Sequence, residues 1–103
     1  MWTSTLGEVV CSPLTYPDNA LVYVAGRTSL SPTDPSLIIP EDLGFDMMTH
    51  PEAVQRGMMY LVLVQTLHAI FENATAQKSC TSEDHWSAFA YYMENDAFIQ
   101  WSE

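Results

Sequence analysis

The residue types that most often perform chemistry are few and widely separated in this chain. Three histidines (His50, His68 and His85) and two cysteines (Cys11 and Cys80) are the strongest candidates. No two histidines stand three or four positions apart, and the cysteines fit neither a CxxC motif nor a mixed cysteine–histidine zinc spacing. We therefore expect no metal site and no cofactor, and we expect both cysteines to be free thiols that are buried or half-buried.

Catalysis without a metal would need another constellation, and the sequence does not provide one. It has no nucleophile elbow, no catalytic-cysteine signature and no glycine-rich phosphate loop, since its four glycines are scattered. Glu41 with Asp42, and Glu83 with Asp84, are adjacent carboxylates at predicted helix starts, where the helix dipole favours them. We expect that the protein is not an enzyme. A pocket that joins a histidine to a cysteine or a carboxylate would reverse that expectation.

The balance of charge is more informative than any motif. Of 103 residues, 13 are acidic and 3 are basic, so the net charge at pH 7 is −10 although only 16% of the residues are charged. A hydrophobic content of 48% with 12% aromatic residues excludes intrinsic disorder, because such a chain can bury a core. The lack of lysine and arginine clusters argues against direct binding to nucleic acid, whose phosphates require them.

The acidic residues are concentrated in two segments without lysine or arginine. Residues 41–52 carry a net charge of −4, and residues 83–103 carry −5. Helix pairing would bring both segments onto one face, which would resemble a nucleic acid's phosphates and be steered towards a basic groove. The residues predicted to bind a partner are the acids Glu41, Asp42, Asp46, Glu52, Glu83, Asp84, Glu94 and Asp96, with Tyr91 and Trp101 as aromatic anchors.

Solvation is the simpler explanation of the same charge, since excess acid keeps a small protein dissolved. A net charge of about 2 to 8 already serves that purpose in a small domain. Further self-repulsion lowers the stability of the folded state. We therefore favour partner binding, and we expect Trp86, which lies among the acids, to pack in the core instead.

The first part of the chain is predicted to form a small sheet. The valine-rich runs Leu6–Cys11 and Ala20–Ala25 are expected to pair as an antiparallel hairpin across a loop that contains two prolines. Residues 26–40 contain three more prolines, so we expect irregular structure there, with a short strand over 37–39 at the sheet edge. One helical turn is predicted over residues 40–44.

A long central helix is predicted next. Thr49 and Glu52 form a capping-box pattern at its start, and an apolar stripe at helical spacing extends to Ala74. Residues 58–64 taken alone are also consistent with a buried strand.

A C-terminal helix is predicted to start at Thr81 or Ser82 and to be interrupted at residues 95–96, with a short terminal helix beyond. The sequence thus predicts an α+β fold in a single compact domain over residues 1–103. An N-terminal antiparallel β-hairpin or small sheet is followed by the long central helix and the C-terminal helix, packed as an antiparallel pair.

Neither export nor membrane insertion is expected. The first ten residues have neither the basic region nor the apolar region of a signal peptide. Residues 57–71 carry no charged side chain, but polar residues interrupt them and they are too short for a membrane span. We expect a cytoplasmic protein without membrane contacts.

In size, acidity and lack of catalytic motifs the chain resembles the small phage-encoded anti-CRISPR inhibitors. The resemblance is one of overall character and covers no motif. It implies an inhibitor in the host cytoplasm that blocks the DNA-recognition or guide-binding surface of a CRISPR effector. Two alternatives remain open: an immunity protein or antitoxin that neutralises a basic toxin, and a non-catalytic dimeric assembly module formed through the apolar residues 58–71. The protein could thus be a monomer or a homodimer.

Overall fold

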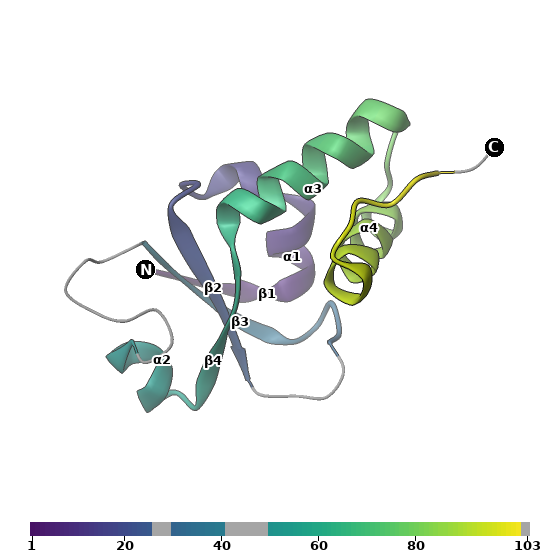
Figure 1. Ribbon diagram of the computed structural model, residues 1–103. Coiled ribbons are helices and arrows are strands. Elements are labelled where there is room, and N and C mark those ends of the chain that lie inside the picture. The colour runs from purple at the N-terminus through teal and green to yellow at the C-terminus, as the bar shows by residue number, and fades with distance from the viewer. Residues whose placement is uncertain (26–29, 41–49, 102–103) are drawn as a thin grey trace.

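The computed structural model describes residues 1–25, 30–40 and 50–101 and confirms the predicted α+β class. Four strands form an antiparallel sheet in the order β1-β3-β2-β4, and helices follow and flank it (Figure 1). The strands are β1 (Trp2–Thr5), β2 (Ala20–Ala25), β3 (Pro35–Pro40) and β4 (Met58–Leu63). The helices are α1 (Leu6–Cys11), the 3-10 turn η1 (Pro13–Thr15), α2 (Pro51–Gln55), α3 (Val64–Gln77) and α4 (Ser82–Asn95).

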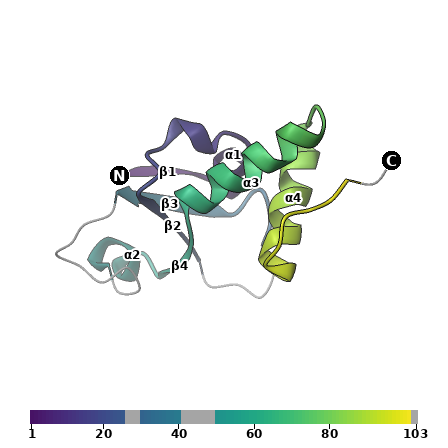
Figure 2. The same ribbon diagram turned by 45° about the horizontal axis from the view of Figure 1, so that its top comes forward.

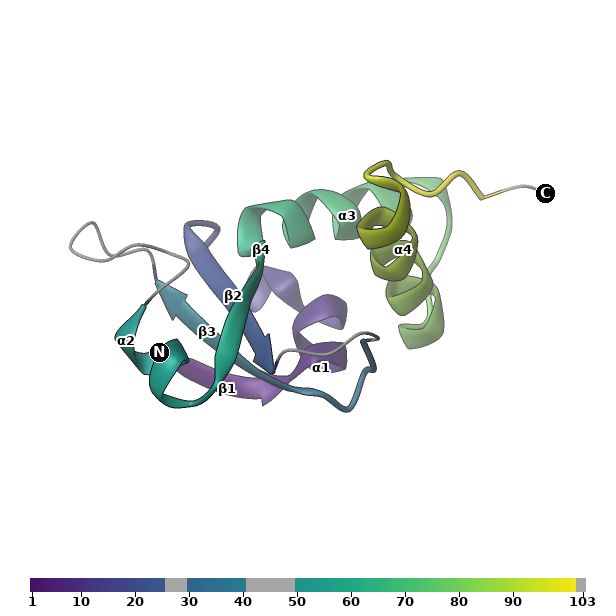
Figure 3. The ribbon, with the colours of Figure 1, turned by 60° about the horizontal axis from the view of Figure 1, so that its bottom comes forward.

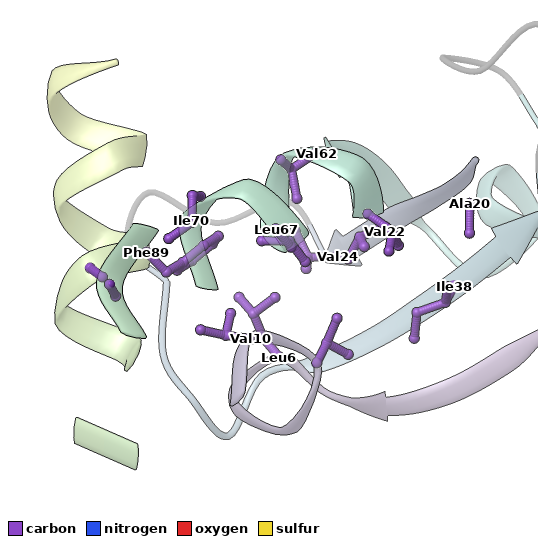
Figure 4. Packing of buried hydrophobic residues seen from close by; sticks show 14 residues of the cluster. Leu6, Val10, Ala20, Val22, Val24, Ile38, Val62, Leu67, Ile70 and Phe89 are labelled. Carbon is purple, nitrogen blue, oxygen red and sulfur yellow. The ribbon is translucent and has the colours of Figure 1, made fainter. Parts of the chain in front are cut away.

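Strand β2 lies inside the sheet and is buried on both of its faces. Successive side chains of a strand point to opposite sides, and here the two sides enter two separate cores. Val22 and Val24 join the larger core with α1, α3 and α4, whereas Leu21 and Tyr23 join a smaller core with α2. The larger core fills the space between the sheet and the three helices (Figure 4). This double burial explains why β2 is a continuous apolar run rather than an alternating one.

The prediction of a continuous central helix is wrong. Helix α2 ends at Gln55, and Gly57 follows with φ +69°, the left-handed conformation that terminates helices. Residues 58–63 then form strand β4, which pairs with β2 and bulges at Leu61, between the partners of Val22 and Tyr23. His50 rather than Thr49 caps α2, because its ring nitrogen accepts the Glu52 amide hydrogen bond at 3.3 Å. Thr49 lies outside the described residues.

The predicted N-terminal hairpin is also wrong. Leu6–Cys11 is helix α1, whose N-cap Thr5 accepts a hydrogen bond from the Glu8 amide, and the strand before it is β1. The strand expected over 37–39 exists as part of β3, but it lies between β1 and β2 and is therefore internal. The helical turn expected over residues 40–44 falls largely outside the described residues.

The C-terminal helix is confirmed. Thr81 caps α4, and its capping box with Asp84 is complete, since each side chain accepts the other residue's backbone N–H. Asp96 ends the helix in the left-handed conformation (φ 54°), and residues 97–101 add no further helix. Helices α3 and α4 pack together as the predicted pair, but they cross obliquely instead of running alongside each other (Figure 3).

Helices α2 and α4 lie at opposite ends of the molecule. The long axis measures 45 Å, against 26 and 21 Å for the other two. Three views agree that α2 is beyond one end of the sheet, while α4 and the residues 97–101 that follow it are beyond the other (Figure 2). Side chains on α2 and on α4 are therefore separated along the long axis of the molecule.

Candidate functional site

Both basic side chains that the structure describes are engaged within the chain. Arg56 Nε lies 3.8 Å from Glu52 Oε2, and Lys78 Nζ lies 3.4 Å from Asp84 Oδ2. The Lys78 ammonium also lies over the Trp101 ring, 4.9 Å from its centroid. Several exposed carboxylates in the described part of the chain therefore have no basic partner there: Glu8, Asp18, Glu72, Glu83, Glu94 and Asp96.

Helix α4 presents two of these carboxylates on one solvent-facing stripe. An α-helix turns once in about 3.6 residues and rises about 1.5 Å per residue. Glu83 and Glu94 are therefore about three turns apart on the same face, with roughly 16 Å between them along the axis. Ser87 and Tyr91 are exposed between them. Tyr91, one of the two predicted anchors, is 38% exposed and remains available on this stripe.

Asp84 and Asp96 are used by the helix itself. The Thr81 N–H donates to Asp84 Oδ2 at 3.0 Å, and this backbone hydrogen bond, with help from Lys78, lowers the pKa of Asp84. Asp84 is thus held as the anion that completes the capping box. Asp96 is exposed at the helix end, and its N–H donates to Tyr92 O at 2.7 Å. Both carboxylates contribute negative charge, although Asp84 is already partly neutralised by its ion pair.

A groove of about 970 Å³ lies between α1 and the first turns of α4. Cys11 Sγ lies 3.7 Å from Ser82 O, a contact that joins the two helices at the groove. On the other side, the Gly7 N–H donates to Pro32 O at 2.8 Å, which brings the segment before β3 against α1. The lining of the groove includes Glu8, Cys11, Tyr16, Pro32, Glu83 and Trp86. The two glutamates are the charged side chains of the described lining.

Trp86 lines both this groove and a second, smaller hollow. The smaller hollow measures about 300 Å³ and is lined by Trp86 together with Leu30 and Glu94, among others. The indole is half-buried and packs against Phe89, with ring centroids 5.2 Å apart, so it belongs in part to the core as the sequence predicted. It also contributes to both hollows, and Glu8, Glu83 and Glu94 are the charged residues that line them.

The structure does not bring the two acidic segments together as far as it describes them. Glu52, on α2, pairs with Arg56 at the opposite end of the molecule from α4. Glu41, Asp42 and Asp46 lie outside the described residues. The acidic surface that can be located is therefore that of α4 with Glu8 of α1, rather than one face shared by both segments.

Trp101 is held by helix α3 rather than presented as a free anchor. Its backbone N–H donates to Gln77 Oε1 at 3.2 Å, and Lys78 covers its ring. It is half-buried and packs against the larger core. Any contact that Trp101 makes with a partner would require this packing to be shared or displaced.

His68 and His85 both contact other groups of the fold. His68 Nε2 lies 2.7 Å from Pro13 O. His85 stacks on Phe71 with centroids 4.5 Å apart, and burial lowers the pKa of His85 despite an opposing effect of Asp84. Within the described residues no group of three or more histidine, cysteine or acidic side chains could hold a metal ion.

Comparison with known proteins adds a family without an assigned activity. A family model described as "Domain of unknown function (DUF7716)" matches residues 3–101. The chain belongs to this family. No curated protein and no solved structure matches the DUF7716 chain. No helix in the described part has the length and apolar character needed to cross a membrane.

The matched residues of this DUF7716 protein include the whole lining of the α1–α4 groove. Glu8 is not among the residues that the sequence predicts to bind a partner, because the sequence predicts a strand over Leu6–Cys11. The signal was present: Thr5 and Glu8 have the spacing of a capping box, which marks a helix start. Trp86 was assigned to the core alone, since sequence periodicity cannot show that a half-buried residue also lines a groove.

Proposed function

We propose that this DUF7716 protein is a small acidic binding protein that inhibits a nucleic-acid-handling protein by occupying its basic groove. One observation carries the proposal. The exposed carboxylates on α4 and beside its groove have no described basic partner, because Arg56 and Lys78 pair with other acids. Their negative potential is thus available to an external cationic surface.

The arrangement suits electrostatic recognition. Complementary charge raises association rates by about 10- to 1,000-fold at low salt. This rate enhancement decreases as salt is added. Tyr91 lies between Glu83 and Glu94 and is an exposed aromatic of the kind enriched in interface centres. The α4 stripe therefore combines steering charge with an apolar contact.

Two kinds of partner have the basic surface that this proposal requires. One is a CRISPR effector, as the resemblance to anti-CRISPR inhibitors implies, and the other is a basic toxin neutralised by an immunity protein or antitoxin. A CRISPR effector holds nucleic acid in a basic groove, and so would a basic toxin that is a nuclease. The proposal commits to the shared chemistry, and identification of the bound partner distinguishes the two.

The test is affinity capture from a bacterial lysate with three forms of the protein. The first is the wild type, the second carries Glu83→Gln and Glu94→Gln, and the third carries Asp18→Asn and Glu72→Gln as a control. The control removes the same charge from exposed positions away from the α4 stripe. We expect the wild type and the control to retain the same basic nucleic-acid-binding protein, identified by mass spectrometry.

The amide variant on α4 is expected to bind the partner at least about twofold more weakly and to retain correspondingly less of it, since the two exposed charge pairs that it loses each contribute about 0.2–1 kcal/mol. Capture by the wild type should fall steeply between about 50 and 500 mM salt, where the screening length shortens to a few ångströms. Retention that is independent of both salt and the α4 carboxylates would contradict the proposal.

The assembly alternative has one observation in its favour. Strand β4 is a sheet edge with no charged residue, and its Met59 is 58% exposed. An apolar edge strand is a template for pairing with a second chain. Two copies that each carry a net charge of −10 repel one another. We therefore expect a monomer in light scattering at low salt, and a salt-independent dimer would favour assembly instead.

A further inference from the structure

The α1–α4 groove joins an aromatic ring to carboxylates on two different helices. Glu8 comes from α1, and Glu83 comes from the first turn of α4. Trp86 is three residues after Glu83 and is therefore its neighbour on the surface of α4. Ser4 Oγ donates to Glu8 Oε2 at 2.6 Å, which restrains the glutamate side chain at the groove. A carboxylate can accept about four hydrogen bonds, so Glu8 retains most of its capacity for a ligand.

We propose that this groove binds a single arginine side chain of the partner protein, between Glu8 and Glu83 and against the Trp86 indole. The proposal rests on the proposed function, because it names the part of the basic partner that the acidic protein holds. It also extends that function from a diffuse charged face to a defined pocket with one occupant.

Charge complementarity selects a cation. The described lining contains two carboxylates and no lysine, arginine or histidine. Within the described lining, an anion would meet both carboxylates without a counter-charge. The N-terminus of α4 beside the groove already has two carboxylates, because Glu83 and Asp84 occupy the first turn of the helix. One of its backbone N–H groups, that of Asp84, also donates to the Thr81 hydroxyl. A phosphate or carboxylate ligand is therefore disfavoured.

Arginine fits the site better than lysine for two reasons. Its planar guanidinium donates five hydrogen bonds in a fork that can reach two carboxylates, whereas an ammonium is a compact point charge. Guanidinium groups also stack on aromatic rings, and tryptophan is the strongest aromatic partner for a cation. The groove volume of about 970 Å³ admits the side chain with the adjoining backbone of the partner.

The experiment is a titration of the ¹⁵N-labelled protein with blocked tripeptides, followed by amide and indole chemical shifts. The probes are acetyl-Gly-Arg-Gly-amide, the same peptide with lysine, the same peptide with citrulline, and inorganic phosphate. Citrulline has nearly the shape of arginine but no charge. We expect the arginine peptide to cause saturable shifts of the Trp86 indole N–H and of the Ser12 and Ser87 amides, which belong to the groove lining.

The arginine peptide should bind at least about threefold more tightly than the citrulline peptide, because a cation–aromatic contact contributes about two- to fivefold and an exposed charge pair about 1.4- to fivefold. The lysine peptide should bind more weakly than arginine, and phosphate should leave the groove signals unchanged. The double variant Glu8→Gln with Glu83→Gln should lose the arginine preference, while the control with Asp18→Asn and Glu72→Gln should keep it. Trp86→Phe preserves an aromatic core contact and should weaken binding without unfolding the protein.

Equal shifts with citrulline, shifts caused by phosphate, or an arginine preference that survives Glu8→Gln with Glu83→Gln would overturn the proposal. Its failure is distinguishable from failure of the proposed function. If the lysate partner is still captured through Glu94 while the groove ignores arginine, only the pocket is wrong. If arginine binds the groove but no nucleic-acid-handling partner is captured, the proposed function is wrong and the pocket stands.

Discussion

Replacement of Gly7 by alanine tests how closely the segment before β3 approaches helix α1 at the groove. A Cβ atom at Gly7 would lie 2.9 Å from both Cβ and the carbonyl oxygen of Pro32, and 3.2 Å from its Cα. Two of these three atoms are backbone, so a side-chain rotation cannot relieve the contact. The Pro32 segment must move away from α1, and the 2.8 Å hydrogen bond from the Gly7 N–H to Pro32 O must lengthen.

The expected loss of stability follows from these contacts. Overpacking in a tight site costs about 1–3 kcal/mol, and a weakened hydrogen bond costs about 0.5–1.5 kcal/mol. The substitution also recovers about 0.5–1 kcal/mol, because alanine stabilises a helix more than glycine does. The free energy of unfolding of Gly7→Ala should therefore fall by about 0.5–4 kcal/mol. Each 1 kcal/mol lowers the melting temperature by about 4–8 °C in a domain of this size.

Urea unfolding followed by tryptophan fluorescence, together with amide chemical shifts, measures the effect. The matched control is Gly57→Ala, which has φ +69° but nothing within 4 Å of its new Cβ. It should lose about 1–2 kcal/mol through backbone strain alone and leave the groove amides unshifted. Gly7→Ala should shift the amides around Ser31 and Glu8. A Gly7→Ala protein as stable as the wild type, with unchanged groove signals, would refute the reasoning.

Three further predictions concern helix α4 and its packing. Phe89 is fully buried in the larger core, so Phe89→Ala should lower the free energy of unfolding in urea by about 3–5 kcal/mol; a loss below about 1 kcal/mol would place this residue outside the core. Thr81→Ala removes the hydroxyl that accepts the Asp84 N–H at 3.2 Å and should cost about 0.5–2 kcal/mol by the same assay, whereas Thr81→Ser should be nearly neutral. Burial lowers the pKa of His85 in the folded state below its ordinary 6.5, so its contribution to stability is complete above pH 6.5 and is lost as the pH falls towards the lowered pKa. His85→Phe, which can keep the stacking on Phe71, should remove this part of the pH dependence below about pH 6.5, and identical pH profiles for the two proteins would contradict it.

Helix α4 could be predicted because its sequence contains its own boundaries. Thr81 provides the cap, acids fill the first turn, and Asp96 stops the helix in a conformation that aspartate tolerates better than most residues. The α+β class and strand β2 were recognisable for a similar reason, since a compact valine-rich run between turn residues favours a strand.

The central region was mispredicted because its decisive signals are single residues. Gly57 ends α2, but an isolated glycine within a helical pattern is often tolerated. The change from β4 to α3 occurs between Leu63 and Val64, and Leu63 provides no side-chain cap hydrogen bond. An apolar run with helical spacing and no boundary residue therefore predicts one helix. In the structure, the first part of this run forms strand β4 because it pairs with β2.

The groove could not be predicted from local sequence at all. Glu8 and Glu83 are far apart in the chain, and both line the groove because α1, α3 and α4 cover the same face of the sheet. What the sequence did indicate was the sign of the charge on α4. The structure adds that the acids there lie on one stripe beside a groove, and that Glu52 lies at the other end of the molecule.

The most direct test of the account is competition between this protein and nucleic acid for the captured partner. The partner is bound to a fluorescently labelled nucleic acid of the kind that it handles, and the protein is added while anisotropy is recorded. We expect the wild type to displace the nucleic acid completely. The Glu83→Gln with Glu94→Gln variant should require at least about twofold more protein, and the Asp18→Asn with Glu72→Gln control should match the wild type. A stable ternary complex, in which the partner holds the protein and the nucleic acid together, would contradict the claim that the acidic face occupies the partner's basic groove.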